Sequence, residues 1–359
     1  MWGKRADMLV HGQDPYNAEP QPRALAESLL TAVDTFYVRN HGPVPELDGD
    51  RWRLRVDGQV DQPLELTLHD LQQQFETQRA MVTLQCAGNR RAGLVEVRDI
   101  PGEDPWGRCA TSNAWWTGVR LADVLARAGV RQAARHVWFE APDVSGLADP
   151  PQTYGSSIPL AKAVTSGVLL AWAMNDEALP AVHGAPLRVV VPGYIGARSV
   201  KWLRRVSPQE DPSSSYFQST AYRVLPAEAD AASAGPGDGI SLGPVALNAE
   251  ILQPQDGAVV DTGPCDVRGY AHAGEGRQVA RVDVSTDGGT TWVQAGLTEA
   301  TDGAWRHWQA RVEVSSGPGR ITVRAWDSSG ASQPESPVHL WNPKGYVNNS
   351  WAHVAVVGR

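Results

Sequence analysis

The residues best suited to carry out chemistry are one cysteine and two arginines in residues 83–91, which read TLQCAGNRR. Cys86 follows an apolar run, residues 81–84, and precedes small residues. A thiolate is a soft metal ligand, and nearby cations favour the thiolate form of a cysteine. Arginine is a preferred partner of tetrahedral oxyanions. The segment therefore offers a metal ligand beside an anion-binding group, although an isolated motif of this kind is more often a buried cysteine beside surface arginines.

Other short segments, in the same order along the chain, match one known family. They are residues 36–45 (FYVRNHGPVP), 188–193 (RVVVPG), 196–202 (GARSVKW), 341–342 (WN) and Trp351. Together with TLQCAGNRR they extend over nearly the whole chain, which resembles the sulfite oxidase family of molybdenum enzymes, in its haem-free plant and bacterial type. The resemblance implies a molybdenum–molybdopterin cofactor, with Cys86 as the one protein ligand to the metal.

The resemblance also implies which residues bind the cofactor. The expected set is Tyr37, Val38, Arg39, Asn40, His41, Cys86, Asp143, His183, Arg188, Ser199, Val200 and Lys201. In this assignment Asp143 accepts hydrogen bonds from the pterin amino groups, and Lys201 provides a positive charge for the phosphate. Outside the family, His183 would more often be an ordinary loop histidine and Lys201 a solvated charge.

A second group of residues is expected at the substrate. Arg39 and Arg91 match family positions that bind the sulfur oxyanion, and Tyr222 matches a tyrosine that donates to the reacting oxygen. Trp106 matches the tryptophan that shapes the pocket. Without the resemblance, Arg39 would be interpreted as a surface charge and Tyr222 as an amphipathic residue near a linker. Trp106 is one of 14 tryptophans, so a core role competes with the pocket role.

The chain departs from the family pattern at Lys344, where the sequence reads WNPKG and sulfite oxidisers usually have an arginine. Lysine keeps the positive charge but loses the bidentate guanidinium fork. We therefore expect Lys344 to contribute to the substrate site with weaker oxyanion binding, or with a preference for a different oxyanion.

The resemblance implies an enzyme that oxidises sulfite to sulfate by oxo transfer and passes the electrons to an external acceptor, either oxygen or a cytochrome. Two alternatives stay open from the sequence. A molybdenum enzyme of the same fold could reduce nitrate or an S-oxide instead. A non-catalytic molybdopterin-binding protein is the other alternative, which the presence of Cys86, Arg39, Arg91 and Tyr222 makes less favourable.

Several stretches predict the elements that must position these residues. Leu121, Val124, Leu125 and Ala128 share one helical face and Gly129 closes it, which predicts a helix over residues 119–129. The other expected elements are a helix over 68–74 beginning near Thr67 and strands over 52–60, 136–140 and 187–191. They do not follow the rhythm of about 30 residues per βαβ unit, so we expect an α+β class with a mixed sheet.

The chain divides into segments of different composition. We expect an N-terminal arm over residues 1–35, a molybdenum cofactor domain over 36–226, a Gly-, Ala- and Pro-rich linker over 227–244, and a last domain over 245–359. Beyond Val245, short strands at roughly ten-residue spacing predict an immunoglobulin-like β-sandwich. The family resemblance assigns this last domain to dimerisation, so we expect a homodimer.

Composition narrows the remaining possibilities. The 359 residues, 42% hydrophobic and 20% charged, are typical of a globular protein, and the net charge of −8 argues against nucleic acid as a partner. No apolar run reaches the ~18 residues of a membrane span, so we expect no membrane insertion. Three cysteines give no disulfide framework and favour a reducing compartment. The polar residues 1–7 do not resemble a signal peptide, so we expect a cytoplasmic protein, or a periplasmic one if a leader has been removed.

Overall fold

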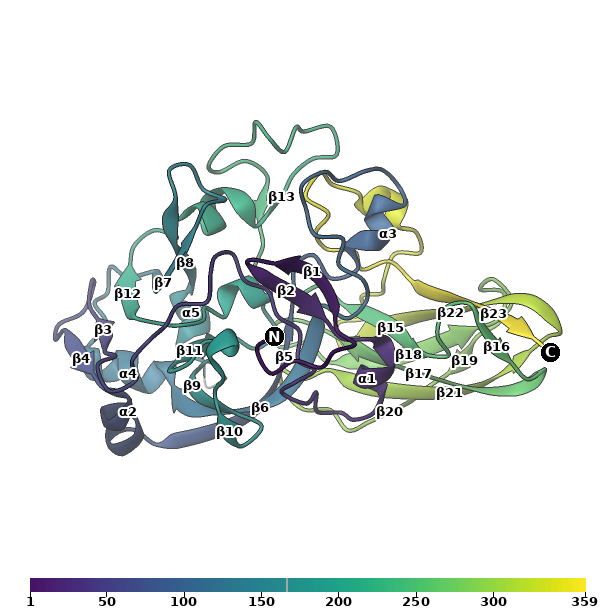
Figure 1. Cartoon of the computed structure of the whole chain (residues 1–359), viewed down its shortest axis with the longest axis horizontal. Helices are drawn as coiled ribbons and strands as arrows, with labels where there is room; N and C mark the ends of the chain where they lie inside the picture. Colours follow the sequence, from purple (N-terminus) through teal and green to yellow (C-terminus); the bar gives the residue numbers. More distant parts are fainter. Residues whose placement is uncertain (166) are drawn as a thin grey trace.

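The computed structural model describes residues 1–165 and 167–359 of the chain. Figure 1 shows a part that mixes helices and strands beside an elongated part built mainly from strands, which confirms the predicted α+β class with a β-sandwich after it. The two parts are in contact, because the C-terminal helix η4 (Pro337–Leu340) packs against α3 (Arg91–Val95). None of the helices in the described residues has the length and apolar character needed to cross a membrane.

Two five-stranded sheets form the framework of the α+β part. The first contains, in order, β10 (Glu177–Ala178), β9 (Leu169–Met174), β6 (Thr111–Arg120) and β5 (Thr77–Gln85), with β11 (Arg188–Val190) also paired to β9. The second contains, in order, β4 (Leu64–Leu66), β3 (Leu54–Val56), β12 (Arg205–Gln209), β7 (His136–Ser145) and β8 (Gln152–Pro159). Because β12 runs parallel to β3 and antiparallel to β7, the second sheet is mixed, as predicted.

The predicted strands lie where expected but differ in length. The strand predicted over residues 136–140 continues to Ser145, because β8 pairs with β7 as far as that residue. The strand predicted over residues 52–60 is only β3, three residues long. It ends because Gly58 adopts a φ of +85° and lies so close to Ser207 that a Cβ there would be 2.3 Å from the Ser207 Oγ.

The two predicted helices are present, although the one predicted over residues 119–129 begins only at Leu121 because Val119 and Arg120 belong to β6. In α4 (Leu121–Ala128) the four apolar residues of the predicted face are buried, and Gly129 ends the helix with a φ of +70°. In α2 (Leu68–Gln74) the Thr67 side chain accepts from the Asp70 backbone N–H while the Asp70 carboxylate accepts from that of Thr67. Local sequence signals therefore determine both helices.

The N-terminal arm is part of the folded body. It forms a hairpin of β1 (Leu9–Gln13) and β2 (Tyr16–Glu19), followed by α1 (Pro22–Ala26). Every residue of β2 is buried, and Ala18 exchanges backbone hydrogen bonds of 3.0 and 2.8 Å with Val38. In Figure 1 this purple hairpin lies over the centre of the molecule, so the arm packs against the segment that carries residues 36–41.

The β part is a sandwich of two sheets. One contains, in order, β15 (Asn248–Gln253), β17 (Gly263–His272), β21 (Arg306–Val314) and β20 (Gly296–Leu297). The other contains, in order, β16 (Ala258–Val260), β23 (Ala352–Gly358), β22 (Gly317–Asp327), β18 (Val279–Ser285) and β19 (Val293–Gln294). Alternate residues of both sheets point inward and share one apolar core, which includes Ile251, Val282 and Val354.

The segment expected to be a linker, residues 227–244, forms a loop whose two ends lie side by side. β13 (Arg223–Val224) pairs with β14 (Ile240–Ser241), so the residues between them form a closed loop. Arg223 ties this loop down by donating to the Gly237 and Gly239 carbonyls at 2.7 Å each. The loop therefore stays beside the α+β part before the chain enters the sandwich.

Candidate active site

One cavity in the α+β part, which we call the inner cavity, is lined by every residue that the sequence predicts to bind the cofactor. These residues are Tyr37, Val38, Arg39, Asn40, His41, Cys86, Asp143, His183, Arg188, Ser199, Val200 and Lys201. The rest of the lining is Phe36, Leu84, Ala87, Tyr154, Gly196, Ala197, Trp202 and Tyr222. Segments that are far apart in the sequence therefore converge on one space.

Cys86 presents the one thiol of this lining. It follows β5 directly, its backbone N–H donates to the Ala110 carbonyl at 2.8 Å, and its Sγ accepts from the Gly88 N–H at 3.4 Å. Burial raises the pKa of the Cys86 thiol, while Arg91 and Arg39 act in the opposite direction. No group of three His, Cys, Asp or Glu side chains suited to a metal ion occurs in the described residues.

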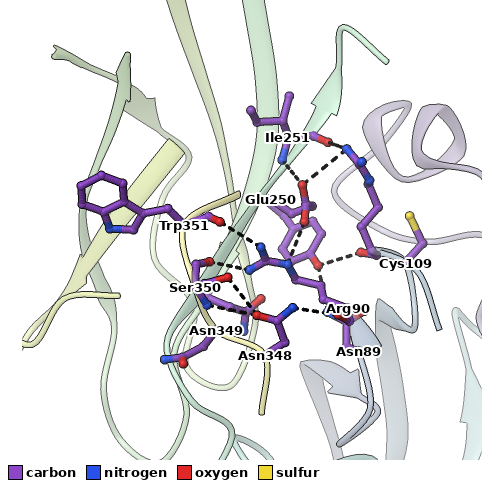
Figure 2. A network of polar contacts seen from close by, with 12 residues as sticks. Asn89, Arg90, Cys109, Glu250, Ile251, Asn348, Asn349, Ser350 and Trp351 are labelled. Atoms are coloured by element: carbon purple, nitrogen blue, oxygen red, sulfur yellow. Dashed lines mark hydrogen bonds and ion pairs between the residues drawn. The ribbon is translucent and has the colours of Figure 1, made fainter. Parts of the chain in front are cut away.

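The loop after Cys86 is fixed by contacts with the β part, as Figure 2 shows. Arg90 has a φ of +66°, and its guanidinium pairs with the Glu250 carboxylate at 3.1 Å. The same guanidinium donates to the carbonyls of Ser350 at 2.7 Å and Trp351 at 3.2 Å. Asn348 donates to the Arg90 carbonyl at 2.8 Å. Residues from β15 and from the chain before β23 therefore determine the path of the cysteine loop.

The cations of the inner cavity have no carboxylate partner in the described part of the chain. Arg188 donates instead to the carbonyls of His183 at 2.9 Å and Ser199 at 3.0 Å, and Lys201 donates to the Asn40 side chain and to the Val182 carbonyl at 3.1 Å. Burial lowers the pKa of Arg188 to about 10, and burial together with Arg188 lowers the pKa of Lys201 well below its usual value. Such desolvated cations favour a bound anion.

Asp143 is the one carboxylate among the lining residues. Burial raises its pKa to about 6, although Lys201 acts in the opposite direction. Its Oδ1 is buried and has no hydrogen-bond partner. A thiol, a cluster of unpaired cations and a free acceptor oxygen together fit an anionic, amino-bearing cofactor that carries a metal, so the residues present fit molybdopterin.

A second space, the outer cavity, adjoins the inner one. Arg39, His41 and Tyr222 line both, so they form the boundary between them. The outer cavity is also lined by Lys344, which is 8% exposed. The remaining lining is Pro15, Asn17, Pro101, Gly102, Glu103, Asp104, Gly146, Leu147, Tyr216, Phe217, Ala221, Ala231, Ala232, Pro343 and Tyr346.

Tyr222 and His41 are in direct contact at this boundary. The Tyr222 hydroxyl lies 2.6 Å from the His41 Nε2. The His41 ring stacks on Tyr154 with ring centroids 4.7 Å apart. Burial, Arg39 and Lys201 lower the pKa of His41 well below its usual value, so this imidazole is neutral. Burial raises the pKa of Tyr222, which therefore keeps its hydroxyl proton at neutral pH.

Two predicted substrate residues are placed differently from expectation. Arg91 lines neither cavity, because its nitrogens are bound to protein acceptors: the Lys344 carbonyl at 3.1 Å, the Asp104 carbonyl at 2.7 Å and the Glu103 carboxylate at 3.1 Å. Trp106 is fully buried in the apolar cluster that includes Cys86, and it also lines neither cavity. It packs against His11 with ring centroids 4.6 Å apart. Both side chains thus lie behind the cavity walls.

Sequence reasoning missed several residues that contact these groups. The Lys4 Nζ lies 2.6 Å from the His183 Nε2 and donates to the Phe36 carbonyl at 2.9 Å, so the arm reaches the back of the inner cavity. Burial lowers the pKa of Lys4 to about 7. Glu103 was missed as well. Neither lies in a recognisable motif, although a carboxylate twelve residues after Arg91 was a possible signal.

Comparison with known proteins agrees with this geometry. A family model described as the oxidoreductase molybdopterin binding domain matches residues 41–217, and one described as the Mo-co oxidoreductase dimerisation domain matches residues 243–358. Mitochondrial sulfite oxidase from Rattus norvegicus is 43% identical over 98% of the chain. The chain spans 66% of the length of that protein, just under two thirds. Sulfite oxidase from Arabidopsis thaliana is 35% identical over 98% of the chain and 94% of its own length.

A solved structure shares the fold. The crystal structure of the sulfane dehydrogenase SoxCD from Paracoccus pantotrophus matches with a TM-score of 0.81 and 27% identity, over 96% of this chain and 85% of that one. The similarity therefore includes both the α+β part and the sandwich. The chain belongs to the sulfite oxidase family of molybdopterin oxidoreductases.

Proposed function

We propose that this protein oxidises sulfite to sulfate with a molybdenum–molybdopterin cofactor and passes two electrons to an external acceptor. The observation that carries the proposal is the junction of the two cavities. The inner cavity contains the Cys86 thiol and unpaired cations, and it meets the outer cavity at Arg39, His41 and Tyr222. Two relatives at 35% and 43% identity are named sulfite oxidase, which supports this choice of substrate.

Each side of the inner cavity would hold one portion of the cofactor. Cys86 would bind the metal, Arg188 and Lys201 would bind the phosphate, and Asp143 would accept from the pterin amino groups. When bound, the cofactor supplies two-electron redox chemistry and oxygen-atom transfer, which side chains alone do not provide. The protein would orient the cofactor and exclude water, since Cys86, Arg188 and Asp143 are all buried.

The boundary residues would act on the substrate. Arg39 and Lys344 carry the positive charges that face the outer cavity and would bind the oxygens of sulfite. Tyr222 keeps its proton because burial raises its pKa, so it would donate a hydrogen bond to the reacting oxygen. Donors that are fixed before the reaction stabilise developing charge without reorganisation. His41 holds the Tyr222 hydroxyl in place from the other side.

The remaining expectations also enter as proposals. The match of residues 243–358 to a dimerisation domain supports a homodimer formed through the sandwich. Cys86, Cys109 and Cys265 are all free thiols, which supports a reducing compartment such as the cytoplasm. Oxygen or a cytochrome would serve as the electron acceptor.

An anaerobic reduction experiment tests the proposed reaction. Molybdenum-loaded protein is mixed with sulfite while its charge-transfer absorbance and the EPR signal of Mo(V) are followed. We expect prompt bleaching in the wild type and none in Cys86→Ser, because the serine removes the soft ligand. Cys265→Ser is the matched control, since Cys265 is a partly buried cysteine of the sandwich far in sequence from the cavity lining.

The negative results of this experiment are informative. No bleaching in fully loaded wild-type protein would contradict sulfite oxidation. Reoxidation of protein reduced with dithionite, either by nitrate or by an S-oxide, would then identify the reductase alternative, and Lys344 would be the first residue to revert to arginine. A cofactor-loaded protein that reacts with none of these substrates would be a molybdopterin-binding protein without turnover.

A further inference from the structure

The guanidinium of Arg91 is held by its surroundings. Each of its three nitrogens has a protein acceptor within 3.1 Å, and the side chain is 3% exposed. A Cβ on Gly88 would lie 2.7 Å from its Nη2, and one on Gly345 would lie 2.6 Å from its Cγ. The glycines therefore leave just enough room for Arg91, which cannot turn towards an incoming anion without breaking these contacts.

Glu103 is the residue that neutralises this arginine. Its carboxylate lies 3.1 Å from the Arg91 Nη2, and the Glu103 side chain is 22% exposed where it lines the outer cavity. Asp104 follows on the same loop and also lines the outer cavity, but its carboxylate accepts from Asn17 at 3.3 Å, and only its backbone carbonyl accepts from Arg91. Of the two acids, only Glu103 forms an ion pair with the arginine.

We propose that Glu103 determines the charge preference of the oxyanion site. With Arg91 paired, Arg39 and Lys344 are the cations that the outer cavity presents, because the Glu103 carboxylate cancels the charge of Arg91 that an anion bound there would otherwise feel. The attraction that is lost in this way grows in proportion to the charge of the anion. The site is therefore tuned to a singly charged oxyanion such as hydrogen sulfite. The proposal rests on the proposed function for the location of the substrate.

Anion binding to the cofactor-loaded protein tests this proposal without any turnover. The dissociation constants of sulfate, a dianion, and nitrate, a monoanion, are measured by calorimetry at one low ionic strength. In Glu103→Gln we expect sulfate to bind about tenfold more tightly and nitrate about threefold, because the Coulomb energy scales with ligand charge. A purely structural role for Glu103 would not change the two anions in this ratio.

Two further variants are references for the size of the change in anion affinity. Asp104→Asn also removes one negative charge from the lining of the outer cavity, so we expect a similar selective gain for sulfate, about tenfold. Glu96→Gln is the matched control, because Glu96 is an exposed carboxylate near Arg91 in sequence that lines neither cavity. We expect it to leave both dissociation constants unchanged within about twofold.

Some results would overturn the proposal. If Glu103→Gln gains no more sulfate affinity than Glu96→Gln, or if sulfate and nitrate gain equally, Glu103 does not set the charge preference. Glu103→Ser provides a second variant if the glutamine protein is poorly folded, and it should show the same selective gain for sulfate. If the sulfate results hold while sulfite fails to reduce the metal, the charge preference stands and the proposed reaction fails.

Discussion

The inner and outer cavities share a wall, but they balance positive charge in opposite ways. In the inner cavity Arg188 and Lys201 donate to neutral oxygens, and neither forms an ion pair with the described residues. Beside the outer cavity Arg91 is paired with Glu103. Buried cations without a partner are costly, and a permanently bound anion relieves that cost. The inner cavity thus suits a resident polyanion, whereas the outer one suits an anion that must bind and leave.

The strongest test of this comparison removes a cation from the inner cavity. Lys201→Met keeps an unbranched side chain that is one atom shorter and deletes its charge. We expect molybdopterin to bind about a hundredfold more weakly, since charge-assisted hydrogen bonds to a phosphate are lost. Pterin content after purification measures this. Lys162→Met is the control, because Lys162 packs over the Tyr194 ring outside the inner cavity. Equal pterin content in both variants would refute the proposed phosphate role.

The boundary between the cavities is tested by Tyr222→Phe. The phenylalanine keeps the ring stacked on Tyr346 but removes the hydroxyl that lies 2.6 Å from the His41 Nε2. We expect kcat for sulfite to fall about thirtyfold with KM little changed, because the donor acts on the reacting oxygen. Steady-state kinetics separate the two constants. A raised KM at unchanged kcat would assign Tyr222 to ground-state binding instead.

The buried carboxylate of the inner cavity predicts a pH effect in the cofactor-free protein. The pKa of Asp143 is raised to about 6 in the folded state. The protonated Asp143 carboxyl group therefore makes its full contribution to the unfolding free energy below the unfolded pKa of about 3.9. This contribution is lost as the pH rises through about 6. Between these limits we expect the unfolding free energy of the wild type to fall by about 2 kcal/mol relative to Asp143→Asn. Denaturant titrations across this range check the difference, and parallel curves would contradict it.

The smallest expected effect is at the outer cavity. Lys344→Arg restores the bidentate fork beside Arg39, and we expect KM for sulfite to fall about threefold with kcat unchanged. The gain is modest because the pair formed by Arg91 and Glu103 stays in place. A KM that rises instead would mean that the compact ammonium of Lys344, rather than its charge alone, fits this cavity.

Much of the inner cavity could be predicted because its residues lie in short motifs. The segments around Cys86, Arg188 and Lys201 each match a motif of the family, and in the structure they all line the inner cavity. Helices α2 and α4 were predictable for a local reason, since their caps and apolar spacing lie within a few residues of each other.

The outer cavity was less predictable because its charges depend on contacts between distant segments. The sequence predicts Arg91 as an anion-binding group, yet Glu103 and two backbone carbonyls occupy its donors. Likewise the sequence shows Lys4 only as part of a polar tail, whereas folding places it beside His183, 179 positions away. No local pattern encodes such pairs. The length predicted for β3 was wrong for a similar reason, because Gly58 adopts a positive φ where it packs closely against Ser207 of another strand.

The ion pair between Arg90 and Glu250 has a consequence for how this protein can be divided into fragments. Arg90 lies four residues after Cys86, while Glu250 belongs to β15 of the sandwich, and both side chains are under 10% exposed. The loop that carries Cys86 is thus completed by the chain beyond residue 245. The two halves are one engineering unit: a truncated catalytic fragment would leave Arg90 without its carboxylate, and a chimera would have to exchange both partners together.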